Sequence, residues 1–401
     1  MRIGSFEFNR RELAGSMGDF GTLFPLAVGY MAVCGMDPAG FLVMIGLVNI
    51  VTGCVYRLPM PVEPQKVIAV VAIAQRWSPS LILATGFGTG IVWLIFGLTG
   101  WIQKVADHTP KAVIRGIQIA LGVMLGWEGG KMLLGWGPWA TVVAPFGGPL
   151  IYVGLGLLAL IVIATLRESR QAPAALVLML LGGAAGWFQG GLADIVQLEF
   201  RLPSFTPFSL EEVGRGMLLA GVAQLPLTAT NAILATSALI KEYWPDRAVT
   251  ERSLAVNMGL MNTTTTWLGG MPLCTGSGGL AGQYYYGART GGANILEGTI
   301  EIGLGLFLAP AIAGFFAAFP MSIVGAMMLM VGLHLARYIL TLRAKDQLPA
   351  GVTVGFALAT NMAVGFCAGI AVYYSVKYYF RLTGRCRGGA PLFRLTPASR
   401  L

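Results

Sequence analysis

Charged residues are scarce in this sequence. Asp, Glu, Lys and Arg make up 11% of its 401 residues, against about 25% in a typical soluble domain. A soluble fold of this length would cover its surface with charged side chains, and this chain has too few to do so. The 55% share of hydrophobic residues also excludes a disordered chain. The composition therefore indicates an all-α polytopic membrane protein, because helices satisfy their own backbone hydrogen bonds in lipid.

Residues and motifs of metal and enzyme chemistry are also scarce. The two histidines are too few for a metal site, and the five cysteines show no CxxC spacing. HExxH and GxSxG are absent, and no glycine-rich stretch ends in the Gly-Lys-Ser/Thr of a P-loop. The net charge of +9 comes from residues at the ends of apolar runs, without a basic stripe. We therefore expect no enzyme activity, cofactor, metal or nucleic-acid partner.

About fourteen apolar segments follow one another along the chain. A helix needs ~20 residues to cross a ~30 Å hydrocarbon core. Two segments, 64–76 and 276–288, are too short to cross alone, and each follows a proline-rich or glycine-rich break. The longer predicted spans are 14–34, 39–57, 80–103, 110–127, 148–166, 172–190, 213–240, 250–268, 293–318, 320–340, 349–362 and 363–381.

Positive charges predict the orientation of these spans. With the N-terminus in the cytoplasm, most Lys and Arg residues fall on the inside. The residues left outside are Arg76, Lys131, Arg201 and Arg215. We therefore expect a multi-pass protein of the cell inner (plasma) membrane with both termini in the cytoplasm.

The two halves of the chain repeat each other. Residues 46–49 (Gly-Leu-Val-Asn) match 259–262 (Gly-Leu-Met-Asn) at an offset of 213, and Pro110–Gly122 matches Pro320–Gly332 at an offset of 210. Seven helices per half is an odd number, so the second copy enters from the opposite side, as in many secondary transporters. The predicted units are a first repeat at 1–190, an extracytoplasmic connection at 191–212, a second repeat at 213–381 and a cytoplasmic tail at 382–401.

The breaks before the two short segments occupy equivalent places in the two halves. Leu58–Lys66 contains three prolines, which force extended backbone, and Met271–Leu280 contains glycines that leave amides open at a helix start. Paired interruptions of this kind mark a transporter's binding site. Each should offer a half-helix N-terminus, and such ends bind anions through free N–H groups and a partial positive charge.

Three stretches resemble signatures of a known family. Residues 60–66 (Met-Pro-Val-Glu-Pro-Gln-Lys), 272–283 with 287–291, and 18–22 (Gly-Asp-Phe-Gly-Thr) are similar to those of the molybdate transporter family. That family is related to the sulfate permeases and shares a fold with the uracil permease. The likeness covers nearly the whole chain.

The resemblance implies fourteen helices in a core and a gate domain, with an oxyanion held between the third and tenth helices and the first and eighth nearby. Glu63 departs from the family pattern, which has a neutral residue there, often Gln. Thr275 departs as well, because the family has His there. The short tail after Phe380 leads us to expect no regulatory domain of the sulfate-permease kind.

Several candidate residues have two interpretations. A lysine at membrane depth costs about 2.5–3.5 kcal/mol on insertion scales, so Lys66 either attracts the anion or pairs with Glu63. Glu63 either carries a proton or neutralises Lys66, and Asp19 either titrates or caps broken backbone; these two acids are the predicted proton-coupling groups. The predicted substrate-binding residues are Asp19, Phe20, Gly21, Thr22, Glu63, Pro64, Gln65, Lys66, Gln224, Thr275, Gly276, Ser277, Gly278 and Gly279.

Together these features predict a secondary-active importer of a tetrahedral oxyanion, molybdate first and sulfate next. Its expected partners are the anion, co-transported protons and the lipid bilayer, and a homodimer stays open. Two alternatives on the same fold are a proton-coupled nucleobase permease and an anion channel or exchanger.

Overall fold

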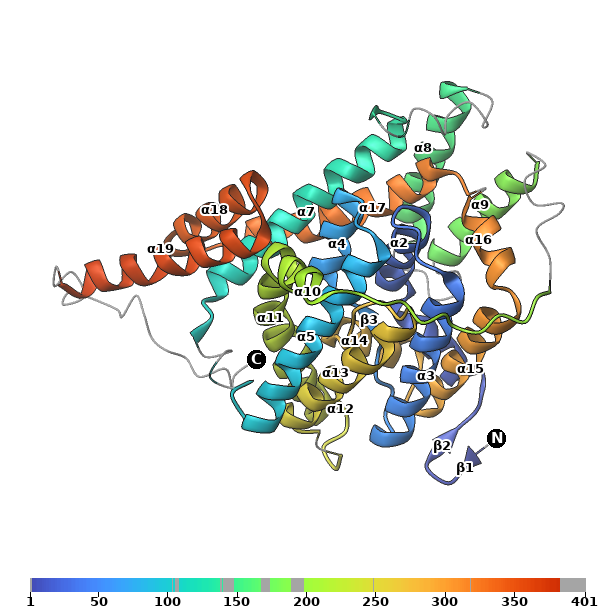
Figure 1. Cartoon of the computed structure of the whole chain (residues 1–401), viewed down its shortest axis with the longest axis horizontal. Helices are drawn as coiled ribbons and strands as arrows, with labels where there is room; N and C mark the ends of the chain where they lie inside the picture. Colours follow the sequence, from blue (N-terminus) through green and yellow to red (C-terminus); the bar gives the residue numbers. More distant parts are fainter. Residues whose placement is uncertain are drawn as a thin grey trace.

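The computed structural model describes residues 2–102, 104, 108–137, 139, 148–166, 174–188, 198–247, 249–317 and 319–382. Helices make up most of these residues, and the strands are two-residue pairs (Figure 1). The predicted tail, apart from residue 382, and the beginning of the predicted connection at 191–212 lie outside the described residues.

Helices of the first half alternate with short breaks. Strands β1 (Arg2–Ile3) and β2 (Phe6–Glu7) pair near the N-terminus. The elements that follow are α1 (Arg10–Ser16), the 3-10 turn η1 (Met17–Asp19), α2 (Phe20–Ala32), α3 (Pro38–Tyr56), β3 (Glu63–Pro64), α4 (Lys66–Gln75), α5 (Pro79–Thr99), α7 (Lys111–Leu134), α8 (Pro149–Leu166) and α9 (Ala174–Phe188).

The second half begins with one long helix made of several parts. These parts are α10 (Leu210–Gly216), the π-helical stretch η4 (Met217–Gly221), α11 (Val222–Leu227), the π-helical stretch η5 (Thr228–Leu234) and α12 (Ala235–Tyr243). The remaining elements are α13 (Glu251–Thr265), η6 (Thr266–Leu268), β4 (Leu273–Cys274), α14 (Ser277–Tyr286), α15 (Gly292–Phe307), α16 (Ala309–Ala317), α17 (Met321–Ala336), η7 (Arg337–Thr341), α18 (Ala344–Ala359) and α19 (Met362–Leu382).

Several helices have the length and composition of membrane spans. Among the described residues, five helical stretches are long and apolar enough to cross a bilayer. They are Pro38–Tyr56, Pro79–Thr99, Pro149–Leu166, Leu210–Tyr243 and Met321–Thr341. Expected spans 39–57 and 148–166 correspond closely to two of these stretches. The chain is therefore a multi-pass membrane protein, while the count of fourteen crossings stays a prediction.

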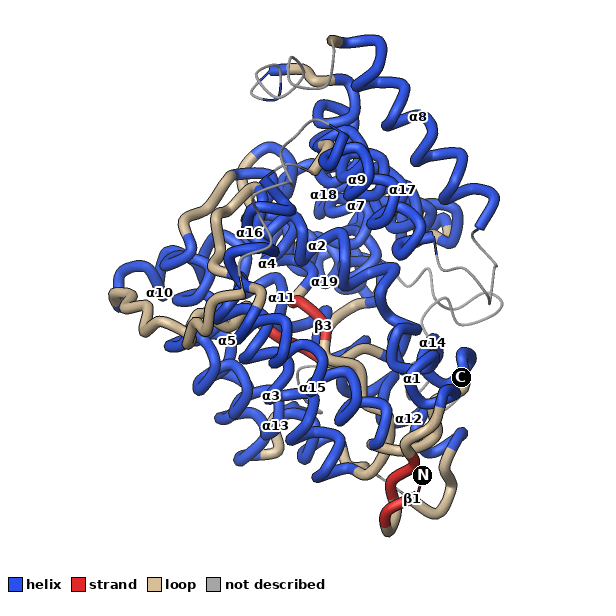
Figure 2. Tube along the Cα trace, turned by 90° about the vertical axis from the view of Figure 1, so that its right-hand side faces the viewer, coloured by secondary structure: helices blue, strands red, loops and turns tan. Residues whose placement is uncertain are grey.

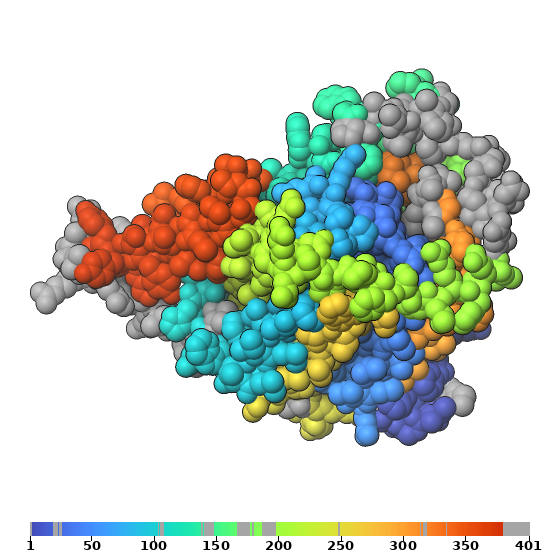
Figure 3. Space-filling model, viewed as in Figure 1, coloured from blue at the N-terminus to red at the C-terminus, as the bar shows by residue number. Residues whose placement is uncertain are grey.

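The predicted span at 293–318 consists of two helices, because the chain bends at Leu308 between α15 and α16. Pro310 has no amide hydrogen and cannot bond the Leu306 carbonyl one turn earlier. The Leu306 oxygen instead accepts from the Arg201 amide at 2.8 Å. Residues 198–209, which carry that amide, cross one face of the molecule in extended form (Figure 3). The freed carbonyl therefore holds the connecting segment in place.

The expected boundary at 213 is also shifted. The long helix begins at Leu210, where the Ser209 hydroxyl accepts from the Glu212 amide and Glu212 accepts from the Ser209 amide. This reciprocal arrangement is a capping box, which satisfies two amides that the first turn leaves open. The end of the predicted polar connection therefore belongs to the helix.

Packing between the halves follows a symmetric pattern. Helix α3 of the first half packs on α15, α5 packs on α13 of the second half, and α7 packs on α17. Backbones approach closely where glycine leaves room: a Cβ added at Gly46 would lie 2.6 Å from the Gly298 carbonyl oxygen. In Figure 1, α18 and α19 project from the body beside α7, and Figure 2 shows the short strands β3 and β4 in the interior with helices around them. The site therefore lies where elements of both halves meet.

Glycine at this helix contact is expected to matter for stability. A Cβ at Gly298 would run into the Gly46 carbonyl oxygen and lie 2.9 Å from Ile50 Cγ1. Gly298→Ala should therefore destabilise the protein by about 1–3 kcal/mol, the usual cost of overpacking. The measurement is thermal unfolding in detergent, with Gly303→Ala as control, because a Cβ at Gly303 meets no atom within 4 Å. Equal unfolding temperatures for the two variants would contradict this close contact.

Candidate functional site

Two short strands place the starts of two half-helices against each other. Strand β3 pairs antiparallel with β4, with Glu63 opposite Cys274 and Pro64 opposite Leu273. One further bond extends the pairing, from the Gln65 amide to the Pro272 carbonyl at 2.8 Å. Helix α4 begins two residues after β3, and α14 begins three residues after β4. The two interrupted segments that the sequence singled out therefore meet, as predicted.

The start of α4 is capped by a side chain from the long helix of the second half. Gln224 Oε1 accepts from the Val67 amide at 2.8 Å, and Gln224 Nε2 donates to Thr228 Oγ1 at 2.7 Å. Gln65 lies just before the helix and uses its own Nε2 to bond Thr89 Oγ1 and the Leu273 carbonyl. Both glutamines are buried. They hold the backbone of the site, so direct contact of Gln65 and Gln224 with a substrate stays a prediction.

The start of α14 is more open than that of α4. Its first helical hydrogen bond runs from the Leu280 amide to the Gly276 carbonyl at 3.0 Å. The preceding amides of Ser277, Gly278 and Gly279 lie in the first turn, where a helix offers N–H groups to outside partners. Gly278 is exposed, and a Cβ there would meet no atom within 4 Å. The α14 start therefore presents backbone donors beside open space.

Two hydroxyls at this end are bonded to the π-helical stretch η5. Thr275 Oγ1 donates to the Ala232 carbonyl at 3.1 Å, and Ser277 Oγ donates to Asn231 Oδ1 at 3.1 Å. A π turn widens the helix and is frequent at functional sites. Because Gln224 reaches α4 from the same long helix, that helix bonds to both half-helix starts.

A buried ion pair lies between the two half-helices. Lys66 Nζ is 2.7 Å from Glu63 Oε2, and the Glu63 side chain is 0% exposed whereas that of Lys66 is 23% exposed. A Cβ added at Gly276 would meet the Glu63 carboxylate, so this carboxylate packs against the N-cap residue of α14. A negative group at a helix N-terminus is stabilised by the helix dipole. Glu63 therefore meets a positive charge from Lys66 and a partial one from α14.

The break in the first helix also approaches α14. The turn η1 packs on α14, and a Cβ at Gly18 would lie 2.5 Å from the Gly282 carbonyl carbon. Helix α2 then begins at Phe20. The side chains of Asp19, Phe20 and Thr22 lie outside the described part of the chain. The backbone of the predicted signature therefore adjoins α14, and the roles of its side chains stay predictions.

Sequence reasoning missed the asparagines that fix the two strands. Asn262 accepts from the Leu273 amide and donates to the Leu273 carbonyl, both at 2.7 Å. Asn294 likewise accepts from the Met60 amide at 2.8 Å and donates to the Met60 carbonyl. The repeat already contained a signal, because Asn49 and Asn262 match at the 213 offset.

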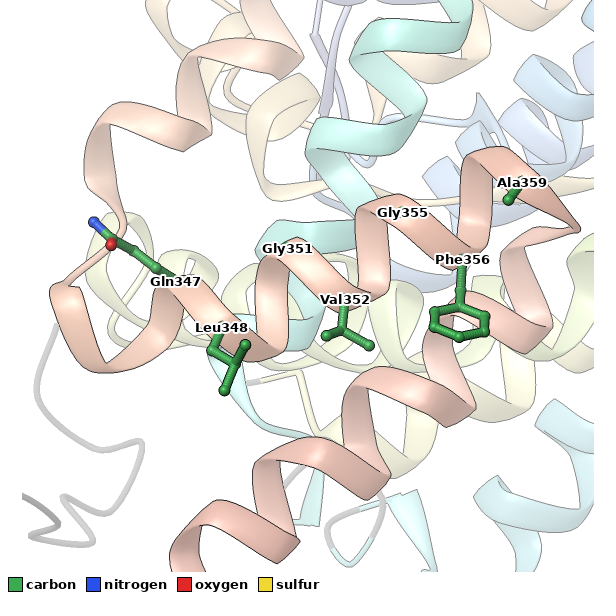
Figure 4. A pocket seen from close by; sticks show the side chains of 7 residues that line it. All are labelled: Gln347, Leu348, Gly351, Val352, Gly355, Phe356 and Ala359. Carbon is green, nitrogen blue, oxygen red and sulfur yellow. The ribbon is translucent and has the colours of Figure 1, made fainter.

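A separate cavity of about 400 Å³ runs along α18 and is shown in Figure 4. Its lining includes Leu348, Val352 and Phe356, with Gln347 as the polar side chain and no charged one. A dianion needs fixed donors and positive charge to replace its water. This cavity therefore does not suit an oxyanion, and the paired half-helices remain the candidate site.

The fold matches solved membrane transporters. The transmembrane domain of the cyanobacterial bicarbonate transporter BicA aligns with a TM-score of 0.66 and 19% identity over 90% of this chain and 97% of that chain. The murine anion transporter Slc26a9 in its inward-facing state aligns with a TM-score of 0.67 and 12% identity over 95% of this chain and 70% of that chain. The chain thus has the fold of these polytopic membrane transporters.

The chain belongs to the molybdate transporter family. A family model described as a molybdate transporter of the MFS superfamily matches residues 11–125 and 216–335. Molybdate transporter 1 of Arabidopsis thaliana is 29% identical over 95% of this chain and 91% of the relative. Molybdate transporter 1 of Chlamydomonas reinhardtii is 29% identical over 92% of this chain and 91% of the relative. The resemblance seen in the motifs is confirmed.

The Gln224 cap is expected to support the α4 start. Gln224→Ala would leave the Val67 amide without its acceptor, which costs about 1–3 kcal/mol for a buried group. We expect a lower unfolding temperature and weaker anion binding, measured by thermal unfolding and calorimetry. Thr230→Val is the matched control, because the Thr230 hydroxyl bonds carbonyls of its own helix. A Gln224→Ala protein as stable as this control would show that the cap contributes nothing.

Proposed function

We propose that the chain is a secondary-active importer of a tetrahedral oxyanion, with molybdate as the first substrate and sulfate as the second. Protons are the proposed driving ion. The observation that carries this proposal is the antiparallel β3–β4 pair, which brings the starts of α4 and α14 together. The names of the relatives support molybdate, and the related fold supports transport across a membrane.

The positive charges around the β3–β4 pair only partly balance the two negative charges of a dianion. Each half-helix start supplies about half a positive charge. Lys66 and Glu63 largely cancel each other at 2.7 Å. The site then offers roughly one positive charge, which leaves a dianion under-compensated. A coupling proton that neutralises a carboxylate near the site would reduce this deficit.

Entry of a dianion also needs a driving force. A cell interior that is negative by ~100 mV opposes each charge by about 2.3 kcal/mol, or roughly 4.6 kcal/mol for a dianion. Import against this potential requires co-transported cations. Proton symport meets this need. The sequence predicts Glu63 and Asp19 as the coupling groups, and no observation in the structure assigns the proton to either of them.

The proposal includes the arrangement of the chain in the membrane. Fourteen segments would form two inverted repeats of seven, with both termini in the cytoplasm and the protein in the cell inner membrane. The packing of α3 on α15, of α5 on α13 and of α7 on α17 supports a two-fold relation between the halves. A homodimer remains compatible with this arrangement.

Uptake into proteoliposomes tests the transport proposal. Labelled molybdate, sulfate and uracil are offered separately, with and without an inward proton gradient. We expect the gradient to drive accumulation of molybdate above its outside concentration, with weaker uptake of sulfate and none of uracil. Uracil accumulation would identify a nucleobase permease, and molybdate equilibration that ignores the gradient would identify a channel or exchanger.

Opposite effects are expected from the two charges of the ion pair. Glu63→Gln removes a negative charge beside the anion and should tighten molybdate binding about tenfold, or about 1.4 kcal/mol. Adding Lys66→Met to that variant should weaken binding again by at least as much. The double variant avoids leaving Glu63 buried without its partner, which would destabilise the fold.

Calorimetry with purified variants gives the affinities, and thermal unfolding is the folding control. If the double variant binds as tightly as Glu63→Gln alone, Lys66 serves only as the partner of Glu63. The positive field would then come from the helix starts.

A further inference from the structure

Two carboxyl groups are buried side by side on α15, away from the ion pair. Glu297 and Glu301 are 7% and 8% exposed. Residues four apart lie on the same face of a helix. Acidic residues buried at membrane depth are costly, and they commonly mark ion or proton paths. Glu297 and Glu301 are therefore candidates for a role in ion or proton transport.

A chain of hydrogen bonds links Glu301 to the segment that leads into β3. Asn49 Nδ2 donates to Glu301 Oε2 at 2.8 Å. Asn294 Nδ2 donates to Asn49 Oδ1 at 2.8 Å, and Asn294 also bonds both the amide and the carbonyl of Met60. Met60 lies three residues before Glu63. The acid on α15 is thus connected to the backbone of the candidate anion site.

The Met60 backbone amide fixes which atom donates in each hydrogen bond of this chain. The Met60 amide can only donate, so Asn294 must present its oxygen there and its nitrogen to Asn49. Asn49 must then present its own nitrogen to Glu301. Glu301 Oε2 is therefore an acceptor, and a proton on this carboxyl belongs on Oε1.

The second half of the chain fixes its strand more simply. Asn262, the counterpart of Asn49, bonds the amide and carbonyl of Leu273 by itself. Leu273 is the counterpart of Met60 at the same offset. Holding the backbone therefore needs one asparagine. At Met60 that residue is Asn294, and Asn49 and Glu301 are bonded behind it. The extra link adds a group that can change charge.

Other titratable groups packed against α15 lie towards its ends. Helix α3 runs antiparallel to α15, and the part of α3 that faces Glu301 carries Gly46 and Asn49. At the C-terminal end of α15, the backbone amides of Glu199 and Arg201 donate to the Phe307 and Leu306 carbonyls. At the N-terminal end of α15, the titratable groups on β2, α1 and the end of α3 are Glu7, Arg10, Arg11, Glu12, Cys54 and Tyr56.

We propose that Glu301, with Glu297 beside it, carries the coupling proton, and that Asn49 and Asn294 relay its charge state to Met60 and β3. The proton is taken from water on one side of the membrane, held as a carboxylic acid and released into water on the other side. This inference rests on the proposed proton-driven import. It assigns the coupling proton to α15, in place of the sequence-predicted carriers Glu63 and Asp19.

A proton fits this site better than a metal cation. Asn49 turns an N–H group towards the carboxylate, whereas a cation requires oxygen ligands. In the part of the chain that the structure describes, no cluster of three or more His, Cys, Asp or Glu residues could hold a metal ion.

The test compares Glu301→Gln with wild type in proteoliposomes. Glutamine keeps an oxygen that accepts from Asn49 and imitates the protonated acid. We expect proton-driven molybdate accumulation to fall to the level seen without a gradient, while exchange of labelled for unlabelled molybdate at equal pH is retained. Glu128→Gln is the control, because Glu128 is a buried acid on α7 that pairs with Lys131 outside this network.

A second measurement applies to protein in detergent. Wild type should take up protons when it binds molybdate in weakly buffered solution, and Glu301→Gln should bind molybdate without that uptake. Asn49→Ala, which keeps the acid and breaks the relay, should still bind molybdate but lose gradient-driven accumulation. This variant covers the case in which Glu301→Gln does not fold.

The failures of the two proposals differ. If wild type ignores the proton gradient, proton-driven import is wrong and Glu301 cannot be its carrier. If wild type responds to the gradient and Glu301→Gln or Asn49→Ala responds equally, only the assignment to Glu301 is wrong. A sodium gradient that replaces the proton gradient in wild type would also overturn it.

Discussion

The pairing of β3 with β4 is the constraint on which the rest of the site depends. A helix that starts inside a membrane leaves amides that neither lipid nor its own turn can satisfy. The extended segments that lead into α4 and α14 face the same problem, and each half supplies one of them. Their pairing places the starts of α4 and α14 beside each other. Slippage of this pairing would displace the two half-helix starts relative to each other. The site therefore belongs to both halves of the chain.

The long helix from Leu210 to Tyr243 connects this ladder to its surroundings. Pro226 cannot donate a backbone hydrogen bond, and π-helical stretches lie on both sides of α11, which contains it. The helix caps α4 through Gln224 and accepts from Thr275 through the Ala232 carbonyl. A shift of this helix would therefore move its contacts with both half-helix starts. Its irregular turns place side chains where a regular helix would not.

Sequence reasoning located the site but not the contacts within it. Prolines at 59, 61 and 64 and glycines at 276, 278 and 279 predicted extended segments and helix starts, because these residues restrict or free the backbone locally. The Glu63–Lys66 pair was one of the two interpretations of those residues. The break at Leu308, the π turns and the path from Glu301 to Met60 depend on which residues meet across helices. Single-sequence periodicity carries no record of such contacts.

The position of the bound anion tests the central claim most directly. Molybdenum scatters X-rays anomalously, so crystals grown with molybdate can show the metal atom without reference to a model of the ligand. We predict one strong peak between the starts of α4 and α14, within hydrogen-bond reach of the first amides of α14 and near Lys66. A peak elsewhere in the molecule, such as in the α18 cavity, with none between the half-helices, would contradict it.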